Sequence, residues 1–329
     1  MAISLTGIQP TGIPHLGNYL GMFRPALRLA RDHEALCFIA DLHALINVRD
    51  PEALRARTRE LTAVWLAFGL DPARASLYRQ SDVPEICEIM WLLAPVTPKG
   101  VLNRAHAYKA AVAENRERGR DPDAGVTAGL YGYPLLMAAD ILAVDAAVVP
   151  VGRDQGQHVE IAREVARAFN GAYGEILREP HADVDPRVMT VPGLDGRKMS
   201  KSYGNVIPLL AEPEELRRCV MRIVTDSRRP EEPKDPEADT IFGLYREFAT
   251  ADDVGAMRAR YEAGGLGYGE AKAALFEVLD EHLREPRARF HALMADPGEL
   301  DRVLAAGAAR ARELAAVTVG RMRAAVGLA

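Results

Sequence analysis

Cysteine is scarce in this chain of 329 residues, which contains three. Cys37, Cys87 and Cys219 lie far apart and form no C-x-x-C pair, whereas structural zinc sites and iron–sulfur clusters use closely spaced ligands. The sequence therefore offers no protein-ligated metal site. Because each cysteine has an apolar residue next to it in the sequence, we expect three buried, reduced thiols.

Long apolar runs are also lacking. A membrane-spanning helix needs about 18 or more consecutive apolar residues, and the most apolar stretch, 135–150, is interrupted by Asp140 and Asp145. The first residues show no charged segment followed by an apolar one, the pattern typical of a signal peptide. We expect a cytoplasmic protein without membrane contact.

An excess of positive charge is absent as well, since the formal net charge is −5. This balance argues against a protein that coats nucleic acid without specificity. It is compatible with a local basic surface, and Arg310, Arg312, Arg321 and Arg323 lie among alanines near the C-terminus. Two interpretations stay open for them, a solvated helix face and a contact with a polyanion.

Strand-like and helix-like segments alternate in the first half of the chain. The strand-like segments are 3–7, 36–42, 76–80 and 146–151. This alternation predicts right-handed βαβ units and a parallel sheet that binds ligands at the carboxyl ends of its strands. Beyond residue 206 the strand signals nearly disappear, and the pattern from about residue 241 is helical and alanine-rich. We predict an α/β domain followed by an all-helical domain.

Two glycine-rich segments have the chemistry of phosphate sites. In 7–21, GIQPTGIPHLGNYLG, a helix from Leu16 would place His15 and Asn18 near its N-terminus, where backbone N–H groups favour phosphate. In 196–205, GRKMSKSYGN, two lysines between glycines are suited to close over phosphates. Simpler interpretations also stay open, namely a turn with a capping histidine and a solvated basic turn.

An aspartate lies within the apolar segment GYPLLMAADIL at 132–142. On a helix, Tyr133, Met137 and Asp140 share one face. A buried carboxylate is costly unless it has partners. Either a nearby backbone N–H or an arginine satisfies Asp140, or the carboxylate accepts a hydrogen bond from a ligand.

Two of these segments together resemble the signatures of class I aminoacyl-tRNA synthetases. PTGIPHLGN at 10–18 is similar to the first signature, and KMSKS at 198–202 matches the second. Asn18, in place of a second histidine, is typical of the tryptophanyl and tyrosyl branch. The stretches GIQPTG, MAADIL and PVGRDQGQH narrow the resemblance to bacterial-type tryptophanyl-tRNA synthetases, over essentially the whole chain.

The resemblance implies a ligase that activates L-tryptophan with ATP and Mg²⁺. The products would be tryptophanyl-adenylate and pyrophosphate, and the amino acid would then be transferred to tRNA(Trp). Three alternatives remain open: a tyrosyl-type synthetase, another nucleotidyltransferase with the first signature, and an auxiliary paralogue. The complete KMSKS argues against the second of them, and Asp140 favours tryptophan over tyrosine.

By resemblance, Lys198 and Lys201 hold the phosphates of ATP. Arg153 stands where many relatives carry an acidic residue, so no side-chain role is carried over to it. The residues that the resemblance assigns to catalysis are Gln9, His15, Lys198 and Lys201. Those assigned to ATP are Gln9, Pro10, Thr11, Gly17, Asn18, Gly152, Arg153, Asp154, Val188, Lys198, Met199, Ser200, Lys201 and Ser202.

In the implied tryptophan pocket, Asp140 accepts the indole N–H, which is a donor only. A competitor without this donor would leave the carboxylate unpaired, and a site of this kind can reject such analogues by ~10⁴–10⁵. The residues that the resemblance assigns to tryptophan are His43, Tyr133, Met137, Asp140, Val149, Val151 and Gln155.

The resemblance also implies a domain organisation. A Rossmann-like catalytic domain would span 1–206, with inserted helices at about 84–135 that form much of a homodimer interface. A helical domain at 207–329 would bind the tRNA anticodon, which gives the C-terminal arginines a purpose. Lys109 lies where relatives carry a mobile, lysine-bearing loop, but the local match is loose and its role stays open.

Overall fold

The structure, a computed structural model, describes residues 2–150, 156–183 and 191–328. Its contacts divide it into two compact units. Unit 1 comprises Met1–Gly12, Pro25–Pro186 and Asp296–Ala329, and unit 2 comprises Ile13–Arg24 and Arg187–Ala295. These units differ from a single division at residue 206, because the last segment of the chain packs with the first.

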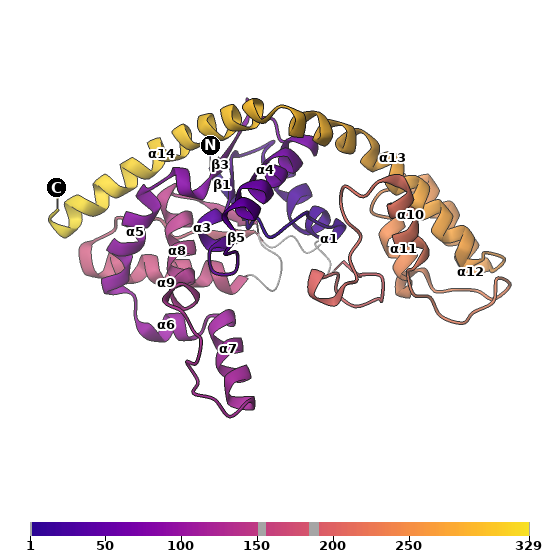
Figure 1. The fold of residues 1–329 in the computed structure, drawn as a ribbon, viewed down its shortest axis with the longest axis horizontal. Coiled ribbons are helices and arrows are strands. Elements are labelled where there is room, and N and C mark those ends of the chain that lie inside the picture. Colours follow the sequence, from indigo (N-terminus) through magenta and orange to yellow (C-terminus); the bar gives the residue numbers. More distant parts are fainter. Residues whose placement is uncertain (1, 151–155, 184–190, 329) are drawn as a thin grey trace. The chain divides into compact units, whose positions relative to one another are not determined.

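Unit 1 is built on a parallel sheet (Figure 1). Its strand order is β3-β2-β1-β4-β5. The strands are β1 (Ile3–Ile8), β2 (Glu34–Ile39), β3 (Ala75–Arg79), β4 (Val148–Pro150) and β5 (His181–Asp183). The four predicted strands are confirmed, with shifted ends. β5 was not predicted.

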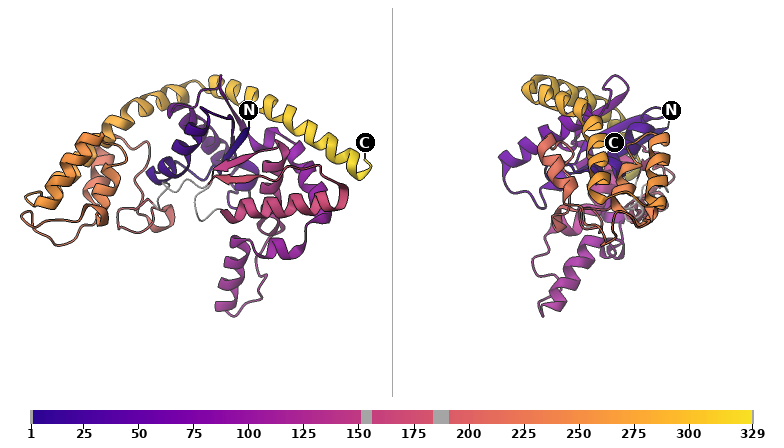
Figure 2. Two further views of the ribbon diagram at one scale, coloured as in Figure 1. Left: turned by 180° about the vertical axis from the view of Figure 1, so that it is seen from behind. Right: turned by 90° about the vertical axis from the view of Figure 1, so that its right-hand side faces the viewer.

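Helices surround this sheet. Those of unit 1 are α3 (Asp41–Ala44), α4 (Pro51–Ala67), α5 (Glu85–Leu93), α6 (Lys99–Asn103), α7 (His106–Glu117), α8 (Ala128–Ala143), α9 (Gly156–Tyr173) and α14 (Pro297–Val326). The Asp50 carboxylate caps α4 by accepting from the N–H groups of Glu52 and Ala53, and Pro51 takes the first helical position. α7 extends away from the sheet of unit 1, as Figures 1 and 2 show from two sides.

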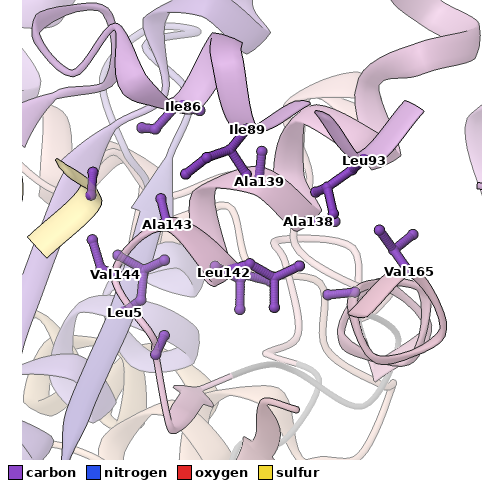
Figure 3. Close-up of a cluster of buried hydrophobic side chains, with 14 of the residues drawn as sticks. Leu5, Ile86, Ile89, Leu93, Ala138, Ala139, Leu142, Ala143, Val144 and Val165 are labelled. Atoms are coloured by element: carbon purple, nitrogen blue, oxygen red, sulfur yellow. The ribbon is translucent and has the colours of Figure 1, made fainter. Parts of the chain in front are cut away.

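The core beside the sheet lies among α5, α8 and α9 (Figure 3). Small side chains on α8 let the neighbouring helices approach closely. The buried members labelled in Figure 3 are Leu5, Ile86, Ile89, Leu93, Ala138, Ala139, Leu142, Ala143, Val144 and Val165. This packing fixes α8, and with it Asp140, relative to the strands.

α14 packs against β3 with small residues. A Cβ atom on Gly307 would lie 2.1 Å from the carbonyl oxygen of Leu77, so no other residue fits there without movement. Ala311 and Ala315 of the same face are fully buried. The alanine-rich pattern predicted this helix, but its place beside the sheet was not predicted.

Unit 2 is largely helical, and its helices are α1 (Leu16–Asn18), α10 (Pro213–Met221), α11 (Thr240–Tyr245), α12 (Ala251–Ala263) and α13 (Tyr268–Ala295). The predicted helix 16–29 is present as α1, a π-helix at Tyr19–Phe23, and α2 (Arg24–Leu29). The helical character of 207–295 is confirmed. Within the described ranges, no helix has both the length and the apolar composition to cross a membrane.

The cysteines are less uniform than expected. Cys37 is buried in β2 and Cys219 is partly buried, but Cys87 is exposed. The expectation of burial was wrong for Cys87, because α5 buries Ile86 and Ile89 on one face and Cys87 lies on another.

Candidate active site

The carboxyl ends of β2 and β3 lie side by side, because the two strands are parallel neighbours. Asp41 follows β2, and its Oδ1 atom accepts hydrogen bonds from the backbone N–H of Ser81 at 2.9 Å and of Leu42 at 3.0 Å. This carboxylate therefore ties the turn after β3 to the turn after β2. Gln80 and His43 are the sequence neighbours of Ser81 and Leu42, so these contacts also constrain their backbone.

Asp140 of α8 reaches this edge of the sheet and is 1% exposed. Gln80 donates through Nε2 to both of its oxygens, at 2.8 Å to Oδ1 and 2.9 Å to Oδ2. The Nε2 atom of His43 lies 3.1 Å from Oδ2. These partners in the described part of the chain are side chains, whereas one alternative from the sequence was a backbone N–H or an arginine.

The electrostatics of Asp140 are a balance of opposing effects. Burial raises the pKa of this carboxyl, the hydrogen bonds from His43 and Gln80 lower it, and the nearby charge of Asp41 raises it further. Two oxygens of a carboxylate offer about four acceptor positions. The three contacts above leave acceptor capacity on Oδ1, so the group can still accept from a bound N–H donor.

Tyr133 and Met137 precede Asp140 on α8, and the structure brings the first of them to His43. The two rings meet edge-on with centroids 6.3 Å apart. Tyr133 also meets His158 of α9 edge-on at 6.2 Å. Met137 and Val149 are partly buried and pack against the same apolar core. Val151 and Gln155, the other predicted tryptophan contacts, lie outside the described residues.

The order of the strands reverses at β1, which has β2 on one side and β4 on the other. Open parallel sheets bind ligands at such a switch point. Gln9, Pro10 and Thr11 follow β1 directly, in a turn closed by a 2.9 Å hydrogen bond from Thr11 N to Gln9 O. The predicted ATP residues Gly152, Arg153, Asp154 and Val188 lie outside the described residues.

Glycine is required within β1 itself. A Cβ atom on Gly7 would lie 2.3 Å from the ring of Phe38 on β2. The aromatic ring therefore occupies the place of the missing side chain. This explains one glycine of the segment 7–21 by packing rather than by ligand contact.

The two signature segments meet inside unit 2. The N–H of Gly17 lies 3.3 Å from the sulfur of Met199, which is 4% exposed. The Asn18 side chain accepts from the backbone N–H of His15 at 3.0 Å, and Asn18 N donates to His15 O at 2.8 Å. The first signature is thus a closed turn on which the Met199 side chain of the second rests.

The second signature is fixed at its base by Asn205, which is buried. Its Oδ1 accepts from Ser200 N at 2.8 Å, and its Nδ2 donates to Lys198 O at 3.1 Å and to Asp195 Oδ1 at 2.6 Å. Ser202 N donates to the Ser200 hydroxyl at 3.3 Å. The side chains of the two signature lysines are exposed while their backbone is anchored.

His15 is poised as a neutral group. Burial, together with the positive charge of Lys201, lowers the pKa of this imidazole to about 4. Its Nδ1 atom is buried and has no hydrogen-bond partner among the described residues. A buried polar nitrogen without a partner is costly, and a phosphate or hydroxyl group of a ligand would satisfy it.

Three functional candidates were missed by the sequence analysis: Gln80, Asp41 and Asn205. Gln80 and Asp41 are polar residues at the carboxyl ends of the predicted strand segments 76–80 and 36–42, and that position was a usable signal. Asn205 was part of the quoted segment but had no assigned role. In the described part of the chain, no group of three or more His, Cys, Asp or Glu side chains is arranged to hold a metal ion.

The C-terminal arginines form ion pairs within unit 1. The pairs are Arg310–Glu34 at 2.7 Å, Arg312–Glu85 at 3.0 Å, Arg321–Asp145 at 2.6 Å and Arg323–Glu88 at 2.7 Å. They join α14 to α5 and to two other segments of the unit. The structure therefore gives these four side chains intramolecular partners, which neither interpretation from the sequence had foreseen.

Comparison with known proteins agrees with these features. The family model of the tRNA synthetases class I (W and Y) matches residues 2–284. The tryptophan--tRNA ligase of Pseudomonas aeruginosa is 54% identical over 329 aligned residues, which cover 98% of this chain and 73% of that protein. The tryptophan--tRNA ligase of Xanthomonas campestris pv. campestris is 53% identical over 328, covering 98% and 76%.

A solved structure is similar over the full length. It is the tryptophanyl-tRNA synthetase of Campylobacter jejuni complexed with ADP and tryptophan, with a TM-score of 0.88 and 39% identity, covering 99% of this chain and 100% of that one. The matched range includes both signature segments and Asp140. The chain therefore belongs to the class I tRNA synthetases for tryptophan and tyrosine, in the branch of the tryptophan--tRNA ligases.

Proposed function

We propose that this chain activates L-tryptophan with ATP and transfers it to tRNA(Trp), as a tryptophan--tRNA ligase of translation. The observation that carries the proposal is the fully buried Asp140, held at the carboxyl edge of the sheet by two side-chain donors. Burying a carboxylate is energetically unfavourable unless it is hydrogen-bonded. An N–H donor on the substrate would be a further hydrogen-bond partner for it. The relatives named for this activity support the same assignment.

Asp140 would select tryptophan over its aromatic competitors. The indole N–H can only donate, and the carboxylate can only accept. Phenylalanine has no donor, and the phenol of tyrosine donates from a different position on a smaller ring. Tyr133, Met137, His43, Val149, Val151 and Gln155 complete the proposed pocket.

The second proposed site binds ATP and stabilises the departing pyrophosphate. The tryptophan carboxylate attacks the α-phosphorus, and negative charge moves onto the leaving group. Lys198 and Lys201 supply positive charge for it, and the neutral His15 supplies a hydrogen bond. Gln9, Pro10, Thr11, Gly17, Asn18, Gly152, Arg153, Asp154, Val188, Met199, Ser200 and Ser202 are the other proposed contacts.

Mg²⁺ would enter with ATP, bound mainly by the phosphates and water. Magnesium in such sites is typically held by substrate phosphates rather than by a dedicated protein cage. The cation would neutralise phosphate charge, alongside the two signature lysines.

The other parts of the chain have proposed roles in assembly and tRNA binding. The catalytic domain would be 1–206, the helical anticodon-binding domain 207–329, and 84–135 would form a homodimer interface. Trp91 on α5 is 74% exposed, and Cys87 on the same helix is exposed too. These two exposed side chains fit an interface with a second copy of the chain. Because tRNA charging serves translation, the cytoplasm is the proposed location.

Tryptophan-dependent ATP–pyrophosphate exchange tests the activation step. With Mg²⁺ present, we expect exchange with tryptophan and only background with tyrosine or phenylalanine. Exchange with tyrosine would contradict the assigned pocket and favour a tyrosyl-type enzyme. No exchange from folded protein would favour a paralogue that has lost the chemistry, and charging of tRNA(Trp) then tests the second step.

A further inference from the structure

We propose that Gln80 is a positioning residue for tryptophan selection, because its side-chain amide fixes the carboxylate of Asp140 as the acceptor for the substrate N–H. This inference rests on the proposed function and adds a residue to it. Gln80 does not belong to any motif of the sequence. Its role follows from its contacts alone.

The first contact concerns both carboxylate oxygens. Gln80 Nε2 lies 2.8 Å from Oδ1 and 2.9 Å from Oδ2 of Asp140, and the Gln80 side chain is fully buried. Rotation of the carboxylate about its Cβ–Cγ bond would lengthen at least one of these contacts. The amide therefore holds the plane of the carboxylate, not only its position.

The second contact decides which end of the amide faces Asp140. Gln80 Oε1 accepts from the backbone N–H of His43 at 3.3 Å. In the flipped amide, the carbonyl oxygen would face the carboxylate and the NH₂ group would face an N–H donor, and both contacts would be repulsive. The start of α3 thus fixes the donor end of Gln80 toward Asp140.

A third set of contacts holds Gln80 itself. Asp41 accepts from the N–H of Ser81, the next residue, at 2.9 Å. The same carboxylate accepts from the N–H of Leu42 at 3.0 Å, three residues beyond the end of β2. A binding group is effective when the residues behind it are themselves fixed. The hydrogen bonds of Asp41 to Ser81 and Leu42 give Gln80 this support, because they join the segments that follow β3 and β2.

The titratable groups around Asp140 influence whether its carboxyl group is ionised. The titratable neighbours are His43 and Asp41 on α3, Tyr78 on β3 and Cys87 on α5. Burial, followed by the charge of Asp140, raises the pKa of both Tyr78 and Cys87, so these two stay neutral near pH 7. Gln80 also donates to Asp140 and cannot titrate, so the donor itself does not change with pH.

Two variants of Gln80 distinguish the effect of its hydrogen bonds from the effect of its side-chain size. Gln80→Met keeps the shape and removes the donors, and Gln80→Glu keeps the shape and can donate only while the new carboxyl is protonated. In ATP–pyrophosphate exchange with Mg²⁺, we expect Gln80→Met to raise the KM for tryptophan by about 10- to 100-fold, as for a lost hydrogen bond to a charged group. We expect the KM for ATP to change by less than about 2-fold, because no ATP contact is removed.

The pH dependence of kcat/KM for tryptophan distinguishes the variants further. In Gln80→Met, loss of a donor raises the pKa of Asp140, so activity falls off at a higher pH on the acid side than in the wild type. In Gln80→Glu, the protonated carboxyl donates at low pH and two anions repel each other at high pH, so activity falls as pH rises. A merely structural role would produce neither shift.

Asn170→Leu is the matched control. Asn170 is a buried amide of α9 that bonds the backbone of Leu177 at 2.8 and 2.9 Å, away from Asp140. We expect lower thermal stability with unchanged tryptophan KM and pH profile. Wild-type tryptophan KM and pH profile in folded Gln80→Met would overturn the inference, and if that variant does not fold, the pH profile of Gln80→Glu decides. Absence of exchange in the wild type would instead refute the proposed function.

Discussion

Gly17 and Met199 are 182 residues apart in the sequence, yet the N–H of the glycine lies 3.3 Å from the thioether sulfur of the methionine. The contact joins the two signature segments within one compact unit. It explains why a large apolar residue lies between two lysines of an otherwise polar loop. The Met199 side chain is buried, whereas the side chains of the two lysines are exposed.

Substitution of Gly17 by alanine tests this contact. The added Cβ would lie 3.0 Å from the His15 ring and 3.4 Å from Met199 Cβ, so the imidazole must shift. We expect kcat of ATP–pyrophosphate exchange to fall by about 10- to 100-fold, since small displacements of catalytic groups are costly. Gly171→Ala, where nothing lies within 4 Å of the new Cβ, is the control. Equal rates for both variants would count against the contact.

Asp140→Asn tests tryptophan selection. The variant keeps the shape of the side chain but sets an NH₂ group against a donor of Gln80 or His43. We expect the tryptophan KM to rise by at least about 10-fold and the ATP KM to stay the same. Stability to urea should fall by about 1–3 kcal/mol, because buried donors lose an acceptor. An unchanged tryptophan KM would refute the pocket.

Lys201→Ala tests the charge that the loop supplies. We expect kcat to fall by about 10²–10³, as when one preorganised electrostatic group is lost, with little change in tryptophan KM. Lys272→Ala on α13, whose ammonium bonds the carbonyl of Met221 at 3.1 Å, is the control and should retain kcat. A change confined to KM for ATP would mean ground-state binding instead of transition-state stabilisation.

The depressed pKa of His15 predicts a loss of stability in acid. The pKa is about 4 in the folded chain and 6.5 in the reference state, so the unfolded chain binds the proton more readily. The neutral imidazole contributes fully to the free energy of unfolding above pH 6.5. This contribution, up to about 3 kcal/mol, is lost as pH falls toward 4. Urea unfolding of the wild type and of His15→Gln at pH 7 and pH 4.5 measures it. Equal losses of stability in the two proteins would contradict the prediction.

The close packing at Gly307 predicts that one added methyl group there strongly lowers the stability of the chain. A Cβ there would meet the Leu77 carbonyl oxygen at 2.1 Å, and Gly320→Ala on the same helix would meet nothing within 4 Å. We expect Gly307→Ala to lower the melting temperature of the chain and Gly320→Ala to raise stability by roughly 1 kcal/mol through helix propensity. Similar melting temperatures would show that α14 does not depend on this approach to β3.

The sequence by itself determined the elements and the chemistry that they carry. Apolar runs bounded by turn residues predicted β1 to β4, and the spacing of Tyr133, Met137 and Asp140 predicted one helix face. These are local properties, because the period of side chains along the backbone decides which segments become strands or helices. The signatures were also recognisable, since each is a short, continuous segment.

The tertiary structure alone decided the partners. Asp140 meets Gln80 and His43, which lie 60 and 97 residues away, and no local pattern specifies contacts across such separations. In the same way, the C-terminal arginines were visible in the sequence, but their pairing with Glu34, Glu85, Glu88 and Asp145 depends on α14 returning to the sheet. Composition fixes which charges a chain has, and packing fixes which of them meet.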